Sequence, residues 1–192
     1  MKKFELTTEF ITNALGKKLF RIKALVEFGS VKAGELGGYA EKEENISQDG
    51  NAWVSDNAWV SDNALVFGDA KVSGNARVSG NARVSDNARV SDNARVSGDA
   101  LISGNARVSG DAWVSDNADY ALVQGFGTEF RCTTFYRGKN KKIMVNCGCF
   151  HGDLEGFRKQ VKETRNGKIA KEYLMIADLM EYHFTSEDSS NE

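Results

Sequence analysis

A six-residue alternation of apolar and polar positions dominates the middle of the chain. In each unit an alanine follows Asn or Asp, and an aliphatic residue stands two positions later. The alanines recur at constant spacing: Ala52, Ala58, Ala64, Ala70, Ala76, Ala82, Ala88, Ala94, Ala100, Ala106, Ala112 and Ala118. This alternation predicts a very short strand whose alanine and aliphatic side chains share one face. The Gly or Asp that closes each unit predicts a tight corner.

Strands this short cannot bury their apolar face alone, so the units must stack on one another as a solenoid. Three sides of six residues predict a triangular coil of about 18 residues, and the array then forms about four coils. At a strand spacing of ~4.8 Å, the stack would be roughly 19 Å long.

The unit also resembles a known repeat. An aliphatic residue followed four positions later by a small one, as in Val54 and Ala58, resembles the hexapeptide repeat of left-handed parallel β-helices. The resemblance covers about 72 of the 192 residues. It implies a mainly β protein with a left-handed triangular parallel β-helix over residues 51–122, and it says little about activity.

Non-repetitive segments flank the array. Residues 1–50 are predicted to form an N-terminal β cap, with strands at 4–6 and 19–25 around a polar turn. Residues 123–184 are predicted to form a small α+β domain. Its strands are expected at 130–136 and 142–150, and one helix is capped by Asp153 while a second follows Asn166-Gly167. Residues 185–192 read as a disordered acidic tail.

The flanks carry a second resemblance. Segments 20–25 and 34–39 before the array, with 133–136 and 147–150 after it, are similar to uncharacterised repeat proteins of phages, prophages and gut bacteria. This resemblance implies a phage or mobile-element origin and a bacterial host. It implies no particular activity.

Composition narrows the function classes. The net charge of −2 provides no overall field toward nucleic acid or an anionic membrane. No apolar run approaches the ~18 residues of a membrane span, and we see no signal peptide. The three cysteines, Cys132, Cys147 and Cys149, are an odd number and favour a reducing compartment. We therefore expect a cytoplasmic protein of the bacterial host, with no membrane association.

An 18-residue coil sorts the outward positions between alanine and aliphatic residue into three columns. The Trp59 column holds Trp59, Arg77, Arg95 and Trp113. The Leu65 column holds Leu65, Arg83, Leu101 and Asp119. The Trp53 column holds Trp53, Lys71, Arg89 and Arg107. Serines form parallel rows beside them, interrupted at Phe67.

The cations and tryptophans of two columns are the candidate binding residues: Trp53, Trp59, Lys71, Arg77, Arg89, Arg95, Arg107 and Trp113. Arginine beside tryptophan suits an acidic partner or a phosphate-bearing aromatic ligand. The alternative is a solvated surface in which the corner aspartates neutralise the arginines, because residues 51–122 hold six Lys or Arg against nine Asp.

The candidate interface is the contiguous outward set Leu65, Phe67, Arg83 and Leu101. Exposed apolar residues that adjoin one another mark a covered surface. We expect the C-terminal domain or another subunit to bury them, in a homo-oligomer such as a dimer or trimer.

Catalytic and metal chemistry find little support. Hexapeptide-repeat acyltransferases use a histidine between coils, whereas His151 and His183 both lie outside the array. Cys147 and Cys149, separated by one residue on a predicted strand, fit two inward-packed side chains better than a metal site. We predict no catalytic residue, no metal and no cofactor.

The leading hypothesis is a non-enzymatic binding protein. Its rigid solenoid surface would bind a host protein or complex such as a defence component, with inhibition as one consequence. The first alternative is a protein that sequesters a nucleotide or another anionic small ligand. The second is a hexapeptide-repeat acyltransferase.

Overall fold

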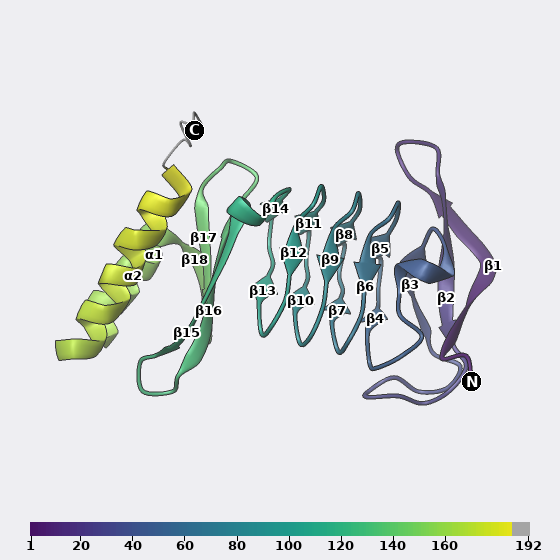
Figure 1. Cartoon of the computed structure of the whole chain (residues 1–192), viewed down its shortest axis with the longest axis horizontal. Helices are drawn as coiled ribbons and strands as arrows, with labels where there is room; N and C mark the ends of the chain where they lie inside the picture. Colours follow the sequence, from purple (N-terminus) through teal and green to yellow (C-terminus); the bar gives the residue numbers. More distant parts are fainter. Residues whose placement is uncertain (186–192) are drawn as a thin grey trace, which may run out of the picture.

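Two-residue strands stack into a triangular parallel β-helix at the centre of the molecule (Figure 1). The structure is a computed structural model in which residues 1–185 are described. The strands of the stack are β4 (Trp53–Val54), β5 (Trp59–Val60), β6 (Leu65–Val66), β7 (Lys71–Val72), β8 (Arg77–Val78), β9 (Arg83–Val84), β10 (Arg89–Val90), β11 (Arg95–Val96), β12 (Leu101–Ile102), β13 (Arg107–Val108) and β14 (Trp113–Val114). They form a β-solenoid of about four turns.

The coil has the predicted 18-residue period. Every third strand pairs in parallel, so that Arg89 lies beside Lys71 on one side and Arg107 on the other. One face is β4–β7–β10–β13, a second is β6–β9–β12, and the third contains β5–β8–β11–β14. Backbone amides donate to carbonyls of the next coil, as in Trp53 N to Ala70 O at 3.0 Å. The pairing satisfies backbone groups that a two-residue strand could not satisfy alone.

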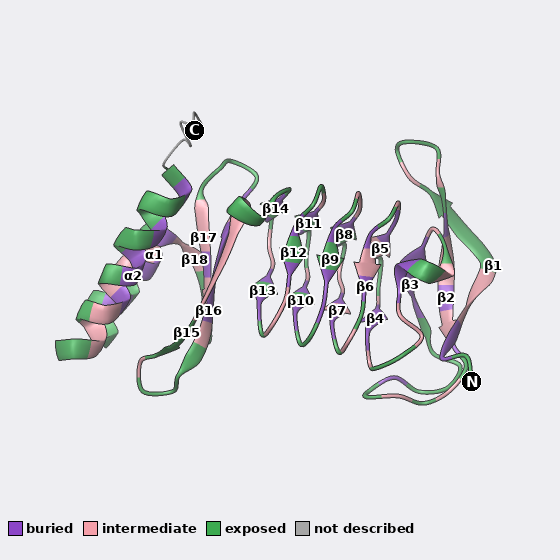
Figure 2. Ribbon diagram, in the orientation of Figure 1, coloured by how far each residue is buried: buried purple, intermediate pink, exposed green. Residues whose placement is uncertain are grey.

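The interior of the coil is uniform. The alanines from Ala52 to Ala106 and the aliphatic residues from Val54 to Val114 have no exposed surface (Figure 2). Small and branched side chains alternate around the axis and leave room for no polar group. The core therefore specifies the coil and carries no chemistry.

The corners explain the choice between Gly and Asp. Asp56, Asp62, Asp86 and Asp92 all adopt left-handed backbone geometry, with φ between 56° and 60°. Each carboxylate accepts a hydrogen bond from the glycine amide 18 residues later, as from Gly104 N to Asp86 Oδ2 at 2.8 Å. Amide ladders run beside these corners, and Asn57, Asn75 and Asn93 lead to Asp111.

The N-terminal segment closes one end of the stack. It contains β1 (Phe4–Thr12), β2 (Lys18–Ala24), β3 (Leu36–Ala40) and the short 3-10 helix η1 (Glu43–Asn45). β1 and β2 form the predicted antiparallel hairpin, and β3 joins β2 to β5 in parallel with the coil. The coil path thus begins before the sequence repeat does.

The C-terminal segment closes the other end. After η2 (Asn117–Asp119) come β15 (Tyr120–Phe126), β16 (Arg131–Arg137), β17 (Ile143–Cys147) and β18 (Phe150–Asp153), which form an antiparallel sheet in that order. α1 (Leu154–Thr164) and α2 (Gly167–Thr185) cover its outer face (Figure 1). Because side chains alternate along β16, Tyr136 packs into the solenoid core while Phe135 packs against the helices.

Several local predictions are confirmed and others are corrected. Asp153 caps α1 as predicted, accepting from Gly156 N at 2.9 Å. The strand expected at 142–150 is two strands, because Gly148 turns the chain with φ of 62°. β15 was not predicted. The acidic tail predicted from residue 185 onward lies outside the described residues apart from Thr185, which ends α2.

Asp119 does not join the Leu65 column. It ends η2, and its carboxylate accepts from Ser115 N at 2.9 Å and pairs with Arg137 Nε at 2.9 Å. The chain leaves the coil here for β15. Among residues 1–185, no helix has the length and apolar character needed to cross a bilayer.

A candidate anion-binding groove

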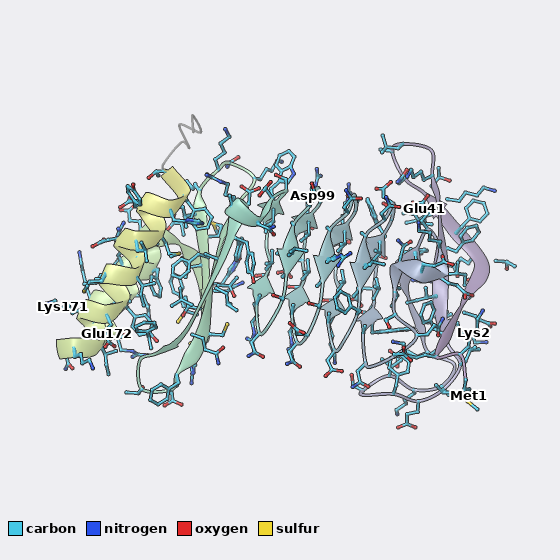
Figure 3. All side chains as sticks on the ribbon, in the orientation of Figure 1. Met1, Lys2, Glu41, Asp99, Lys171 and Glu172 are labelled. Atoms are coloured by element: carbon cyan, nitrogen blue, oxygen red, sulfur yellow. The ribbon has the colours of Figure 1, made fainter. Side chains whose placement is uncertain are left out.

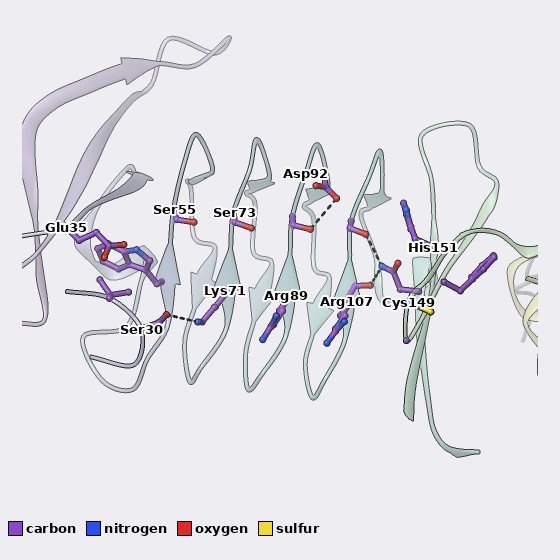
Figure 4. A pocket seen from close by; sticks show the side chains of 17 residues that line it. Ser30, Glu35, Ser55, Lys71, Ser73, Arg89, Asp92, Arg107, Cys149 and His151 are labelled. Carbon is purple, nitrogen blue, oxygen red and sulfur yellow. Dashed lines mark hydrogen bonds between the residues drawn. The ribbon is translucent and has the colours of Figure 1, made fainter. Parts of the chain in front are cut away.

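A groove of about 570 Å³ runs along the β4–β7–β10–β13 face (Figure 4). Its floor holds three cations in one column, Lys71, Arg89 and Arg107, joined by parallel pairing of their strands. A row of serines lies beside them: Ser55, Ser73, Ser91 and Ser109. We call this feature the cationic groove. The cations of neighbouring coils lie about 4.8 Å apart at the backbone.

The three cations lack acidic partners within the described chain. Lys71 Nζ donates to Ser30 Oγ at 3.1 Å. No Asp or Glu of residues 1–185 forms an ion pair with Lys71, Arg89 or Arg107. The aligned positive charges repel one another, and the two carboxylates that line the groove, Glu35 and Asp92, form no ion pair with them in the described chain.

The corner aspartates form no direct ion pair with this row among residues 1–185, and the self-compensating alternative stays open at longer range. Asp92 lines the groove, but its Oδ2 accepts from Gly110 N at 3.0 Å and from Ser91 Oγ at 3.4 Å. The Asp92 carboxylate is thus hydrogen-bonded to the corner of the next coil. The other corner aspartates in left-handed geometry accept the same bond and keep their negative charge, and Asp62 also pairs with Lys17.

The N-terminal wall of the groove comes from the loop that precedes β3. Ser30, Val31 and Glu35 line this end, above Trp53. Trp53 is not the exposed residue that the column predicted, since only 4% of it is accessible. Its ring packs edge-on against Phe28 at 5.4 Å, and its indole Nε1 is buried without a hydrogen-bond partner in the described chain.

The C-terminal wall comes from β17, β18 and the turn between them. Asn146 fixes it to the last coil, because its Nδ2 donates to Arg107 O at 2.8 Å and to Ser109 Oγ at 3.0 Å. The exposed residues Cys149 and His151 also line this end. Cys149 therefore does not pack inward as predicted, because the turn at Gly148 directs it away from the strand.

His151 reaches the corner at Gly110, although the two residues lie 41 positions apart in the sequence. A Cβ added at Gly110 would lie 3.1 Å from His151 Cε1, so the bare glycine makes room for the imidazole. Sequence reasoning missed this placement because it depends on how the C-terminal sheet docks. The local signal is a glycine at the corner, and because such glycines recur throughout the array, it does not single out Gly110 as the contact of His151.

In the Trp59 column, each arginine pairs with a tryptophan of the same column. The Arg77 guanidinium lies over the Trp59 ring at 5.6 Å, and Arg95 lies over Trp113 at the same distance. These four residues form two cation–π pairs. A smaller hollow of about 240 Å³ lies over Arg77 and Arg95, with Lys139 at its rim.

The Leu65 column is not covered by the C-terminal domain. Phe67 remains 39% exposed and Leu101 46% exposed, with the exposed Arg83 between the two leucines. The C-terminal sheet stacks on the end of the coil instead of folding back along its side (Figure 1). Burial of this set by another subunit stays a prediction.

Burial favours the neutral form of two side chains near the last coil, Tyr136 and Cys132. Burial raises the pKa of the Tyr136 hydroxyl, which lies 3.5 Å from Ser109 Oγ. Burial also raises the pKa of the Cys132 thiol, an effect that Arg107 partly opposes. Residues 1–185 contain no group of three or more His, Cys, Asp or Glu side chains arranged to hold a metal ion.

Comparisons with known proteins bear on the solenoid. No curated protein matches the chain. A family model described as the YdcK β-solenoid repeat matches residues 70–86, 76–90, 82–98, 88–103 and 100–116. The matched region lies within the coil and includes Lys71, Arg89 and Arg107. The chain is thus similar to the YdcK β-solenoid repeat over the part of its array that forms the floor of the cationic groove.

Proposed function

We propose that this chain is a non-enzymatic binding protein whose cationic groove holds an anionic segment of a macromolecular partner. The observation that carries the proposal is the aligned row of Lys71, Arg89 and Arg107, which has no acidic partner among residues 1–185. A bound polyanion would relieve the repulsion within the row. Serine hydroxyls beside it would supply further hydrogen bonds.

Contrast with the Trp59 column supports this reading. There, each arginine is stacked on a tryptophan of the adjoining coil. In the groove the equivalent arginines contact no aromatic ring in residues 1–185, and the one tryptophan of the column is buried. The same repeat thus produces one face whose arginines pair with tryptophans and another face whose arginines have no aromatic or acidic partner among residues 1–185.

The resemblance of the flanks directs the choice of partner. For a protein of phage or mobile-element origin, a bacterial host protein with an acidic surface segment is the natural occupant, and a defence component is one such protein. Occupation of that segment would block its other contacts. The rigid coil limits the entropy lost on binding, because its side chains are displayed from a fixed scaffold.

Two equivalent arginines make a matched test. Arg89 lies in the cationic groove, whereas Arg83 is exposed at the same position of the neighbouring unit on the β6–β9–β12 face. We expect Arg89→Ala to weaken binding of an acidic peptide by about tenfold, which is ~1.4 kcal/mol, and Arg83→Ala to leave it unchanged. Fluorescence anisotropy with a labelled oligoglutamate peptide measures both.

Capture from a bacterial lysate extends the test to the natural partner. A specific protein retained by the wild-type chain and by Arg83→Ala, but lost with Arg89→Ala, would support the proposal. Equal capture by both variants would place the partner elsewhere on the molecule. Binding should also weaken as salt is raised, because exposed charges are screened.

A small anionic ligand is the second candidate. The groove is walled at both ends, and its volume of about 570 Å³ lies in the range of small-molecule sites. A thermal shift with nucleotides or cyclic dinucleotides that disappears in Arg89→Ala would favour this candidate. No shift with any of them would remove it.

Acyl transfer keeps one supporting observation, the position of His151 at a coil corner in the groove. Loss of His151 separates the two kinds of function. In a transferase, His151→Ala would abolish turnover of acyl-coenzyme A. In a binding protein, no turnover is measurable and the variant retains most of its affinity for the acidic peptide.

A further inference from the structure

The outer face of α2 carries an apolar stripe that no part of the described chain covers. Met175, Leu179 and Tyr182 are 60%, 58% and 72% exposed. Spacings of four and three residues place the three side chains on one side of the helix. The opposite side packs against the C-terminal sheet and α1 through Tyr173, Ile176, Ala177, Met180 and Phe184. A helix that is apolar on two faces is typical of a buried element.

Four of the charged residues on α2 stand in the half of the helix that the dipole disfavours. Lys168 and Lys171 lie in the N-terminal half, where the positive end of the dipole disfavours cations. Asp178 and Glu181 lie in the C-terminal half, where anions are disfavoured. Glu172 and His183 are exceptions, but the remaining charges follow one order along α2, basic before acidic.

Ion pairs within the chain neutralise only some of the charges on α2. Arg158 of α1 donates to Asp178 at 2.6 Å and to Glu181 at 2.8 Å, which leaves one net negative charge at this end. Lys168 pairs with Glu172 at 3.5 Å. Lys171, on the outer side of α2 (Figure 3), forms no ion pair with residues 1–185.

We propose that α2 is a self-association surface and that its occupant is the α2 of a second copy, packed antiparallel. Two-fold symmetry would place the basic half of each helix against the acidic half of the other. Met175 and Leu179 of the two copies would then meet at the centre, and Lys171 of each copy would lie near Glu181 of the other. The dipoles of the two antiparallel helices would also attract one another.

The position of α2 suits such a pair. It is the outermost element at the C-terminal end of the molecule (Figure 1). Two copies joined there would form an end-to-end dimer that leaves both cationic grooves open. Self-association and anion binding are therefore separable properties, and this inference does not depend on the proposed function.

Sedimentation equilibrium of the full chain over a concentration series tests the proposal. We expect a monomer–dimer equilibrium whose dissociation constant rises at least about tenfold in Leu179→Asp. Leu15→Asp is the matched control, because Leu15 is 82% exposed on the turn between β1 and β2 and should leave the equilibrium unchanged. Leu101→Asp separates this surface from the Leu65 column, because a dimer formed through α2 keeps its dissociation constant in this variant, whereas a dimer formed through the Leu65 column would lose affinity.

Charge reversal tests the antiparallel arrangement. Lys171→Glu and Glu181→Lys should each weaken self-association. Mixing the two variants should restore dimers, because opposite charges then meet at both ends of the helix pair. A wild-type chain that stays monomeric throughout the series would overturn the proposal. So would a dimer that is lost in Leu101→Asp and unchanged in Leu179→Asp, or a mixture that fails to recover.

Discussion

At the scale of single residues, the corner of each coil decides what the solenoid displays. A left-handed corner admits Gly without strain, or Asp at a cost that its side chain offsets by accepting from the next coil. Every aspartate in this geometry is followed 18 residues later by Gly, never by another Asp. Stacked aspartates would place like charges about 4.8 Å apart. The corner thus holds each carboxylate in a hydrogen bond to the next coil, and Asp62 shows that a carboxylate held in this way can also pair with a cation.

Asp86 provides a test of this account. Asp86→Ala loses the acceptor for Gly104 N and keeps a Cβ in left-handed geometry, so we expect a loss of about 1–2 kcal/mol. Asp86→Gly loses the same hydrogen bond but relieves the strain, and should cost less. Urea unfolding compares the two variants. Equal stabilities would show that backbone geometry does not govern the corner.

At the scale of elements, the N-terminal cap is held to the coil partly by a buried cation. Lys3 is only 4% exposed, and its Nζ donates to Ala52 O at 3.0 Å. The ammonium lies 4.9 Å from the centre of the Phe28 ring. Burial lowers the pKa of Lys3 from its usual 10.5 to about 8, although Asp49 and Asp69 oppose the shift. The contact between β1 and the first coil therefore depends on pH.

The sign of this dependence follows from proton binding. Between about pH 8 and pH 10.5, Lys3 binds more protons in the unfolded chain than in the folded one. The stability contributed by this group therefore rises with pH across that interval and is constant below it. We expect the wild-type chain to gain about 1–3 kcal/mol over Lys3→Met on moving from the lower to the upper limit. If the free energies of unfolding of the two proteins change with pH in the same way, the lowered pKa of Lys3 is contradicted.

At the scale of the whole molecule, the groove depends on how many coils separate its two walls. The floor comes from the repeat, whereas the walls come from the N-terminal loop and the C-terminal hairpin. After a whole coil the chain is back on the same face of the solenoid, whereas after one side of a coil it is on the next face. The walls face one another only while the number of residues between them stays a multiple of the coil period.

Two deletions separate coil number from coil register. Removing residues 75–92 takes out one coil and keeps both walls on one face. We expect a folded, less stable chain that still binds the acidic peptide with reduced affinity. Removing residues 87–92 takes out one side, moves the C-terminal wall to another face and should abolish peptide binding. Circular dichroism confirms folding in each case, and undiminished binding after the shorter deletion would contradict the groove.

The coil follows from the amino-acid sequence alone, because a two-residue strand with one alanine and one aliphatic side chain can bury them only by stacking on other strands. The period followed, and with it the columns that align Lys71, Arg89 and Arg107. The two α-helices and the capping role of Asp153 were also readable, since caps and apolar spacing are local signals.

Which outward residues stay exposed depends on how the two ends of the chain pack against the coil. Trp53 occupies the same repeat position as Trp113, yet the N-terminal loop buries the first while 45% of the second remains accessible. His151 reaches Gly110 because the C-terminal sheet docks on the last coil, a contact between segments that share no pattern. The repeat specifies its interior through short-range stacking. Its exposed surface is selected by long-range packing of the two caps, which no periodicity encodes.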